Sequence, residues 1–334
     1  MSNNISNLSV LVTGGAGFIG SHIVEYLLNN GVKQVRILDN LSTGSMSNIK
    51  HLVGKSETGN SGIAGKFKNL EFMWGDICSL ETCRKACVGM SVICHQAALG
   101  SVPRSIDDPL SSHNVNVNGF VHIIVAAKES GIKRIVYASS SSVYGTNDSP
   151  TKIEANIGDE LSPYAVTKHV DELYGAIFTK VYGMECIGLR YFNVFGPRQN
   201  PAGAYAAVIP KFIKAMIGGE PITINGDGTY SRDFTYVDNV VHANILALTT
   251  ANIKCFSQVF NVGTNNSISI NQLFDMIKKL INNDKLVATY GPIRKGDVPY
   301  SNASIYKITS MLNYKPKIYF EEGLKKTIDF FSAN

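Results

Sequence analysis

The sequence predicts an α/β fold, a doubly wound parallel sheet joined to a smaller, interleaved mixed α/β domain. In the first half of the chain, short β-branched runs alternate with longer segments of helical spacing. These short runs are apolar almost throughout, which is typical of parallel strands covered on both faces. Right-handed crossovers between such strands give a sheet that binds ligands at the carboxyl ends of its strands.

Five strands are expected in the first half, at 8–12, 35–38, 70–73, 92–94 and 135–137. Helical spacing is found at 19–28, after the first strand, and at 117–129, before the fifth. The segment 43–68 is rich in Gly, Ser and Asn, which predicts a long exposed connection with one short helix. A further apolar run at 259–262 is expected to return to the main sheet, so we predict that the domains are interleaved in the sequence.

The domain boundaries follow from a change of pattern after Asn193, where Gly and Pro are scattered and the alternation weakens. The prediction assigns 1–193 and about 233–263 to the sheet domain. It assigns about 194–232 and 264–334 to the smaller domain, which is expected to hold the substrate. A chain of 334 residues is long enough for this division.

Composition restricts the classes of function. The chain has 44% hydrophobic and 17% charged residues and a net charge of +5, with Lys and Arg scattered rather than clustered. No nucleic-acid surface is therefore indicated, and the positive excess suits an anionic small ligand. No apolar run reaches membrane-spanning length, and no signal peptide is predicted. The six cysteines form no CxxC pair, which favours buried thiols in a reducing, cytoplasmic compartment.

A glycine-rich loop follows the first predicted strand and opens the first helix. It runs from Gly14 through Gly17, Phe18 and Ile19 to Gly20, with the spacing GxxGxxG. Glycine permits a tight turn, and the helix N-terminus favours negative charge, so the loop predicts a bound pyrophosphate. A purely structural turn is the alternative interpretation.

Asp39 and Asn40 end the second predicted strand, where a carboxylate can bind the adenosine ribose. The same carboxylate would repel a 2′-phosphate, so NAD is favoured over NADP; a loop cap is the alternative for Asp39. His95 is interpreted as a packed strand-end residue rather than a catalyst. Further cofactor contacts are expected after the third and fourth strands, from Asp76, Ile77, Gln96, Ala97 and Ala98.

The segment SPYAVTK at 162–168 predicts the start of a helix, with Ser as N-cap and Pro at the first position. Tyr164 and Lys168 then lie one turn apart on the same face. An ammonium group beside a phenol favours the phenolate, a general base for a sugar hydroxyl. Such a pair also occurs on ordinary amphipathic helices. Ser140 and Ser142, at the end of the fifth strand, strengthen the functional interpretation.

Together, the glycine loop, Asp39, the serine cluster and the Tyr164/Lys168 pair resemble the extended short-chain dehydrogenase/reductases along nearly the whole chain. More narrowly, the chain is similar to the UDP-sugar 4-epimerases related to UDP-galactose 4-epimerase, and closest to those acting on UDP-N-acetylglucosamine. The resemblance implies a Rossmann NAD-binding domain, a UDP-sugar-binding domain and tightly bound NAD. It also implies a homodimer formed through helices that flank the sheet.

The resemblance assigns roles to the reactive residues. Tyr164 is the catalytic base, and Lys168 binds the nicotinamide ribose and tunes the tyrosine. Ser140 contacts O4 of the sugar, and Ser142 is the second hydroxyl residue of its motif. Ser141 and Ser142 stand where related dehydratases and decarboxylases carry carboxylates, so the implied reaction is reversible C4 epimerisation through a 4-keto sugar.

Other contacts are also implied by the resemblance. Asn116 lies near the cofactor, Tyr191 belongs to the stretch closing the nicotinamide pocket, and Asn193 contacts the diphosphate. Arg232 and Arg294 match diphosphate-binding arginines, whose guanidinium groups suit phosphate oxygens. The remaining substrate contacts are expected from Ser101, Ala207, Val208, Asp297 as the ribose-binding carboxylate, and Ser301.

The sugar is inferred from one position in this resemblance. Ser301, the fourth residue after Asp297, stands where a tyrosine excludes an N-acetyl group and a small residue admits it. Ala206 and Ala207 stand where glucose-preferring relatives have larger polar residues. The expected substrates are UDP-N-acetylglucosamine and UDP-N-acetylgalactosamine, precursors that suit polysaccharide biosynthesis.

Three alternatives stay open. Tyr300 precedes Ser301, so a shift of one residue would restore a bulky gate and favour UDP-glucose and UDP-galactose. UDP-glucuronate or its N-acetylated counterpart is another substrate class that fits the motifs. A non-enzymatic NAD-sensing protein on the same fold is a remote alternative, because such proteins typically lack the catalytic pair.

Overall fold

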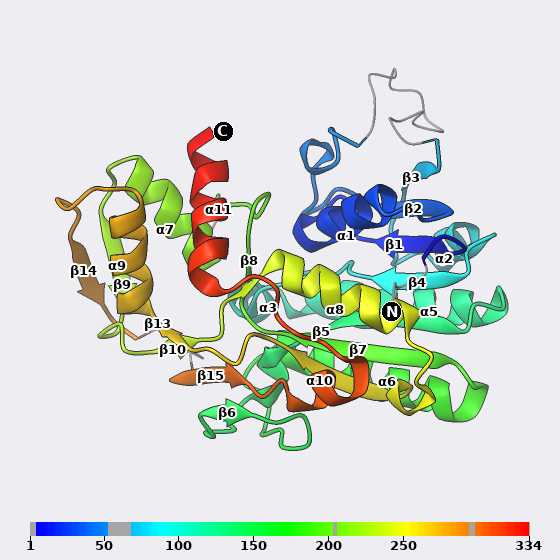
Figure 1. The fold of residues 1–334 in the computed structure, drawn as a ribbon. Helices are drawn as coiled ribbons and strands as arrows, with labels where there is room; N and C mark the ends of the chain where they lie inside the picture. The colour runs from blue at the N-terminus through cyan, green and yellow to red at the C-terminus, as the bar shows by residue number, and fades with distance from the viewer. Residues whose placement is uncertain (1–4, 53–67, 203–205, 294–297, 334) are drawn as a thin grey trace.

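The computed structural model describes residues 5–52, 68–202, 206–293 and 298–333. A parallel sheet of seven strands forms its centre (Figure 1). From edge to edge its strands are β12 (Gln258–Val262), β7 (Glu185–Tyr191), β5 (Arg134–Ser140), β4 (Val92–His95), β1 (Ser9–Thr13), β2 (Gln34–Asp39) and β3 (Leu70–Trp74). The predicted doubly wound parallel sheet is confirmed, and the apolar run at 259–262 returns to it as β12.

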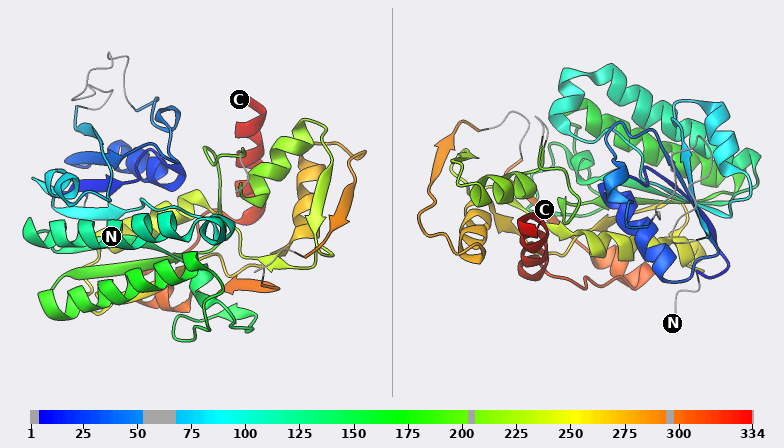
Figure 2. Two further views of the ribbon diagram at one scale, coloured as in Figure 1. Left: turned by 180° about the vertical axis from the view of Figure 1, so that it is seen from behind. Right: turned by 90° about the horizontal axis from the view of Figure 1, so that it is seen from above.

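Helices cover both faces of this sheet (Figure 2). One face carries α1 (Phe18–Asn29), α8 (Val237–Thr249) and α10 (Tyr306–Leu312); the other carries α2 (Leu80–Cys87), α5 (Gly119–Glu129) and α6 (Pro163–Tyr182). Val10 and Val12 pack into the first of these cores and Leu11 into the second. Successive side chains of a strand point to opposite faces, so burial on both faces explains why the strands are continuously apolar.

Two predicted segments differ from the structure. The helix expected at 117–129 is preceded by a π-helical turn, η2 (Asn114–Asn118), that continues into α5. Such turns arise where one extra residue is accommodated in a helix, which residue periodicity alone does not reveal. In the connection expected at 43–68, the short helix is a 3₁₀ turn, η1 (Met46–Asn48), and 53–67 lie outside the described residues.

The rest of the chain forms a smaller part beside the sheet, in which α7, α9 and α11 group with β9 and β14 (Figure 1). Its helices are α7 (Val208–Ile217), α9 (Ile270–Leu280) and α11 (Phe320–Ala333). Its strands are β9 (Ile222–Asn225), β10 (Ser231–Arg232), β13 (Ile268–Ser269), β14 (Ala288–Gly291) and β15 (Tyr300–Ala303). An aromatic core of Phe195, Phe234, Tyr236 and Phe320 holds this part together.

The remaining elements of the described residues are short. They are α3 (Val102–Asp107), α4 (Pro109–His113), η3 (Ser141–Tyr144), β6 (Thr151–Lys152), β8 (Val194–Phe195), β11 (Thr235–Tyr236) and η4 (Ile253–Cys255). β15 pairs with both β10 and β6, so the smaller part is tied to the segment that follows β5. Among the described residues, no helix is long and apolar enough to cross a membrane.

Candidate active site

The glycine loop between β1 and α1 leaves no room for side chains. Gly14 has φ +68°, and a Cβ added there would lie 2.7 Å from the backbone nitrogen of Ala97. A Cβ on Gly17 would lie 3.0 Å from the Gly14 carbonyl oxygen, and one on Gly20 would overlap that oxygen. This loop presents bare backbone at the N-terminus of α1, a geometry that suits the pyrophosphate of a dinucleotide.

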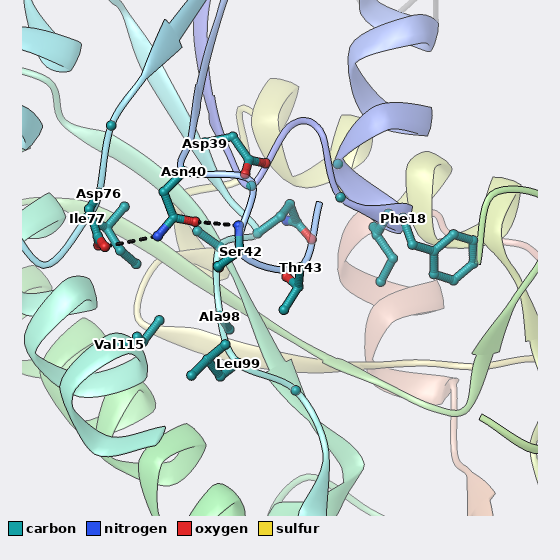
Figure 3. A pocket seen from close by; sticks show the side chains of 18 residues that line it. Phe18, Asp39, Asn40, Ser42, Thr43, Asp76, Ile77, Ala98, Leu99 and Val115 are labelled. Atoms are coloured by element: carbon teal, nitrogen blue, oxygen red, sulfur yellow. Dashed lines mark hydrogen bonds between the residues drawn. The ribbon is translucent and has the colours of Figure 1, made fainter. Parts of the chain in front are cut away.

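A cleft of about 290 Å³ opens at the carboxyl ends of β1 to β4 (Figure 3). It is lined by these residues expected to bind the cofactor: Gly14, Gly17, Phe18, Ile19, Gly20, Asp39, Asn40, Asp76, Ile77, Gln96, Ala97 and Ala98. It is also lined by residues that the sequence analysis did not name: Ser42, Thr43, Gly75, Leu99, Gly100 and Val115. Most of these lie within three positions of a residue named from the sequence. Extending each predicted segment at a strand end by two or three residues would therefore have included them.

Asp39 joins the glycine loop to the second strand. Its Oδ2 accepts from the backbone N–H of Ala16 at 2.9 Å, and its Oδ1 accepts from that of Leu41 at 2.8 Å. Burial raises the pKa of the Asp39 carboxyl, while these two N–H groups oppose the shift. Asp39 therefore caps the loop and lines the cleft at once, so the two interpretations of this residue are compatible.

Asn40 and Asp76 meet across the floor of the cleft (Figure 3). The Asn40 amide donates to Asp76 Oδ2 at 2.9 Å, and Asp76 Oδ1 accepts from the Cys78 N–H at 2.8 Å. Burial opposes ionisation of Asp76, but these hydrogen bonds outweigh it and lower its pKa. An ionised Asp76 can accept hydrogen bonds at the edge of an adenine ring.

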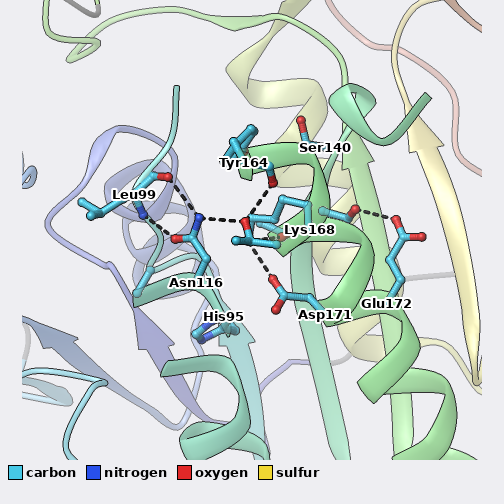
Figure 4. A network of polar contacts seen from close by, with 12 residues as sticks. His95, Leu99, Asn116, Ser140, Tyr164, Lys168, Asp171 and Glu172 are labelled. Atoms are coloured by element: carbon cyan, nitrogen blue, oxygen red, sulfur yellow. Dashed lines mark hydrogen bonds and ion pairs between the residues drawn. The ribbon is translucent and has the colours of Figure 1, made fainter. Parts of the chain in front are cut away.

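Tyr164 and Lys168 lie on the first turns of α6, beside Ser140 at the end of β5 (Figure 4). The Ser162 side chain caps α6 by accepting from the N–H of Ala165, as the sequence predicts. Lys168 is only 2% exposed, and its Nζ donates to the Ala138 carbonyl oxygen and to Asp171 Oδ2, both at 3.0 Å. The ammonium group is therefore held in place by the sheet on one side and by its own helix on the other.

Asn116 connects this helix to the cleft (Figure 4). Its Oδ1 accepts from the Leu99 N–H at 2.8 Å, and its Nδ2 donates to Thr167 Oγ1 at 3.1 Å. Thr167 in turn donates to the Tyr164 carbonyl oxygen at 2.8 Å. The π-helical turn η2 carries Asn116, and π-turns occur frequently at functional sites.

The serines after β5 divide into two groups. Ser142 donates to Ser140 Oγ from its N–H at 3.1 Å and from its hydroxyl at 3.0 Å. Ser139 instead donates to buried Glu172, whose carboxylate also pairs with Arg190. The predicted substrate-facing serines are therefore coupled to each other, and Ser139 belongs to an internal network that ties α6 to the sheet.

Tyr191 lies behind the cleft. Its hydroxyl donates to Gln96 Oε1 at 3.0 Å and accepts from Asn244 Nδ2 at 2.8 Å. Tyr191 therefore holds the side chain of Gln96, which lines the cleft. The predicted direct contact of Tyr191 with the cofactor stays a prediction. Asn244 on α8 was not anticipated, because its partners lie far away in the sequence. Asn193 is exposed, with φ +20°.

His95 agrees with its interpretation as a packed residue. It is 1% exposed, and its Nδ1 lies 2.8 Å from Thr13 Oγ1. Burial lowers the pKa of His95 to about 3, with a smaller contribution from the positive charge of Lys168. The ring is therefore neutral at working pH and does not supply a proton.

In the smaller part of the chain, β10 and β15 pair so that Arg232 and Ser301, both predicted substrate contacts, are Cα partners. Ser301 is buried with 7% exposure, whereas Tyr300 is 51% exposed. Alternation along the strand directs the two side chains to opposite faces. The predicted contacts Arg294 and Asp297 lie outside the described residues.

Ala303 links β15 to the serine segment. It packs in one buried cluster with Val143, Tyr144 and Phe192. Its N–H also donates to Asp233 Oδ2 at 3.2 Å. This packing connects the strand that carries Ser301 to the segment that carries Ser142.

The other predicted substrate contacts come from separate elements. Ser101 caps α3 and has φ +104°, a conformation that a residue with a side chain rarely adopts and that is concentrated at functional sites. Ala207 is the N-cap of α7, and Val208 is its first residue. Ser101 follows Gly100 of the cleft, so its backbone strain lies at the rim of the cleft.

Comparisons with known proteins identify a family and solved structures that this chain resembles. The model of the NAD dependent epimerase/dehydratase family matches residues 10–263. The chain is 34% identical to a UDP-glucuronate 4-epimerase of Thermodesulfobacterium geofontis, over 97% of this chain and 96% of that protein. Two solved structures align with a TM-score of 0.87 over 98% of this chain and 99% of theirs. They are a Thermotoga maritima UDP-glucose 4-epimerase with UDP-glucose, 35% identical, and a Methanobrevibacter ruminantium UDP-N-acetylglucosamine 4-epimerase in complex with UDP-N-acetylmuramic acid, 38% identical.

Proposed function

The chain belongs to the NAD dependent epimerase/dehydratase family, and from this premise we propose that it interconverts UDP-N-acetylglucosamine and UDP-N-acetylgalactosamine. The broader activity, UDP-sugar 4-epimerisation, is common to the relatives named above, the family is NAD dependent, and both fit the site. The acetylated sugar is the new element of the proposal. The observation that carries it is the small, buried Ser301 in register with Arg232.

The chemistry follows from side chains on three elements. NAD, when bound, accepts and later returns the C4 hydride. Tyr164 removes the proton from O4 as a general base and, after the 4-keto sugar has turned over, returns a proton to O4 as a general acid. Ser140 donates a hydrogen bond to O4, supported by its hydrogen bonds with Ser142. Lys168 favours the phenolate by its charge and binds the nicotinamide ribose.

Substrate binding is assigned to the smaller part of the chain. Arg232 and Arg294 pair with the diphosphate, because guanidinium groups match phosphate oxygens. Asn193 contacts the same diphosphate, and Asp297 binds the ribose. The 4-keto sugar must turn over between the two hydride transfers, so this part has to hold UDP firmly and leave the hexose room to rotate.

Ser301 is the residue that we propose to lie beside the C2 substituent of the hexose. The side chain is small and inward-facing, whereas the bulky Tyr300 faces outward. A register shift that would place a tyrosine at the gate is disfavoured, because it would turn the exposed face of β15 inward. We therefore expect an N-acetyl group to be accommodated beside Ser301, and we propose acetylated rather than non-acetylated or uronic sugars as substrates.

We propose that the active form is a homodimer built on α6. Leu173, Ile177 and Val181 are 55%, 51% and 60% exposed, and their spacing forms a stripe along one face of the helix. A second copy of the same chain would cover this stripe with a matching one. We expect Ile177→Glu to convert the dimer to a monomer in light scattering. A wild-type protein that is monomeric at micromolar concentration would contradict this proposal.

We propose a cytoplasmic location and the domain division expected from the sequence, with the sheet domain binding NAD and the smaller domain binding the UDP-sugar. All six cysteines are free thiols, which suits a reducing compartment. Fractionation of source cells with an antibody to the chain would test the location. Recovery of the protein from an extracytoplasmic fraction would contradict it.

The test of the substrate is an incubation of purified protein with UDP-N-acetylglucosamine or with UDP-glucose, without added cofactor, followed by proton NMR. Conversion mainly of the acetylated sugar is expected, because NAD stays bound and Ser301 leaves room for the acetyl group. Preference for UDP-glucose would contradict the role of Ser301. Conversion of neither sugar, together with conversion of UDP-glucuronate, would move the assignment to the uronic acids.

A further inference from the structure

Asp171 is a buried carboxyl group at the active site to which the mechanism above gives no role. It lies on α6 three residues after Lys168 and is 0% exposed. Its Oδ2 accepts from Lys168 Nζ at 3.0 Å. Its Oδ1 is buried and has no hydrogen-bond partner among the residues that the structure describes.

A second buried aspartate shows what a purely structural carboxylate looks like in this fold. Asp233 is also 0% exposed, and both of its oxygens are satisfied. Oδ1 accepts from the N–H and the hydroxyl of Thr264, and Oδ2 accepts from the N–H groups of Asn265 and Ala303. Native proteins rarely leave a buried polar atom unsatisfied, so each such atom calls for an explanation. The half-satisfied Asp171 therefore differs from Asp233, whose two oxygens both have partners within the fold.

The groups around Asp171 leave Lys168 as its charged partner. Glu172, the next residue, pairs with Arg190 on β7. Tyr137 on β5 interacts electrostatically with Asp171, and burial holds its pKa well above the usual range, so it is neutral. His95 on β4 faces Lys168 and is neutral as well. Burial raises the pKa of Asp171 to about 7, against the opposing effect of Lys168.

The geometry of the ammonium group defines what Asp171 can do. A lysine ammonium has three N–H donors. The Ala138 carbonyl and Asp171 Oδ2 accept two of them, each at 3.0 Å, from the sheet and from the helix. Together these two acceptors fix the rotation of the group and thereby the direction of the third N–H.

We propose that Asp171 is a positioning residue for Lys168, directing the third N–H toward the nicotinamide ribose and limiting by its negative charge how strongly the ammonium favours the Tyr164 phenolate. The inference rests on the roles proposed above for Tyr164 and Lys168. An ionised Asp171 partly cancels the field of the ammonium at the phenol. A neutral side chain at the same place leaves that field uncompensated.

Two substitutions separate the charge of Asp171 from its hydrogen bond. Asp171→Asn keeps an acceptor for Lys168 and removes the charge, and Asp171→Leu removes both. The matched control is Asp329→Asn, which makes the same chemical change in an exposed pair with Lys325 at 2.9 Å. All variants are tested as the full chain with retained NAD, and their folding is checked by circular dichroism.

The main measurement is kcat and KM as a function of pH, on whichever UDP-sugar the wild type converts. For Asp171→Asn we expect the acidic limb of the kcat profile to move down by about one pH unit, with KM unchanged, because the uncompensated ammonium favours the phenolate. For Asp171→Leu we expect kcat to fall about tenfold or more. Asp329→Asn should overlay the wild type. An Asp171→Asn profile that also overlays the wild type overturns the proposal.

Binding of NADH gives a second measurement that does not depend on the sugar. After removal of the retained cofactor, fluorescence titration is expected to show about tenfold weaker NADH binding to Asp171→Leu than to Asp329→Asn, because the third N–H of Lys168 is no longer directed. Equal affinities would overturn the positioning role. A wild type that binds NADH but does not convert UDP-N-acetylglucosamine would contradict the proposed substrate and leave this comparison intact.

Discussion

The cleft that the cofactor is expected to fill is shaped mainly by backbone, whereas the proposed sugar side is formed by side chains on short strands. At the cleft, Gly14 and Gly20 allow the chain to approach itself more closely than any side chain permits. On the proposed sugar side, β10 and β15 are only a few residues long, and Asp233, which follows β10, accepts a hydrogen bond from the N–H of Ala303 in β15. Backbone requirements restrict the sequence strongly, but many different side chains can occupy a short strand. This difference agrees with the comparisons, in which the family is NAD dependent and the relatives' names state different sugars.

Tyr164→Phe removes the proposed catalytic base, which is expected to act between the cofactor and the sugar. It should have the largest effect on kcat. Loss of the proton acceptor is expected to lower kcat about 10³-fold, while NAD stays bound. Tyr306→Phe is the matched control, because Tyr306 is 81% exposed. Kinetics on the converted UDP-sugar, with retained NAD measured by absorbance, check this. A fall of less than tenfold would mean that another group takes the proton.

Gly14→Ala should break the backbone-defined cleft. The residue has φ +68°, and the new Cβ would lie 2.7 Å from the Ala97 nitrogen. We expect a loss of about 2–3 kcal/mol in the free energy of unfolding and loss of retained NAD.

Gly31→Ala is the control for Gly14→Ala, because Gly31 has φ +74° but no atom within 4 Å of an added Cβ. This variant tests backbone strain alone. We expect a loss of about 1 kcal/mol in the free energy of unfolding, with NAD retained. Equal losses of unfolding free energy in urea for both variants would show that close packing at Gly14 is unimportant.

Ser301→Tyr should alter only the sugar side. We expect turnover of UDP-N-acetylglucosamine to fall about 10–100-fold relative to UDP-glucose, with NAD retention unchanged, because a phenol fills the space for the acetyl group. Tyr300→Ser changes the exposed neighbour and should leave the preference as it is. If Tyr300→Ser shifts the preference and Ser301→Tyr does not, the gate lies on the opposite face of β15.

The smallest effect is expected in the pH dependence of stability. It concerns Asp171, the buried partner of Lys168. Its pKa is raised to about 7 in the folded protein, so the folded state binds this proton more tightly than the unfolded state. Its contribution to the free energy of unfolding therefore falls as the pH rises from about 4 to about 7. Relative to the wild type, Asp171→Asn should gain stability across this range in urea denaturation. A difference that stays constant with pH would contradict the raised pKa.

Much of the fold and of the cofactor site could be predicted from the sequence. Apolar runs such as Val10–Val12 must be buried on both sides, and the glycine spacing restricts the turn, so strand order in the chain and the cleft followed from local rules. The pair Tyr164 and Lys168 was found because helical spacing alone places both on one face. The roles proposed for the site residues stay predictions, which the substitutions above test.

Contacts between distant segments could not be predicted in this way. Asn244 contacts Tyr191, and Asp233 binds β15. Asp171 binds Lys168, and its second oxygen has no partner within the described part of the chain. None of these residues stands in a local sequence pattern that predicts its burial, because Asn and Asp are mostly exposed residues. The sequence by itself determined the parallel sheet, the glycine loop and the Tyr/Lys pair, since spacing along the chain is sufficient for each. Only the tertiary structure decided which polar groups are buried together, because burial and partners depend on how elements pack.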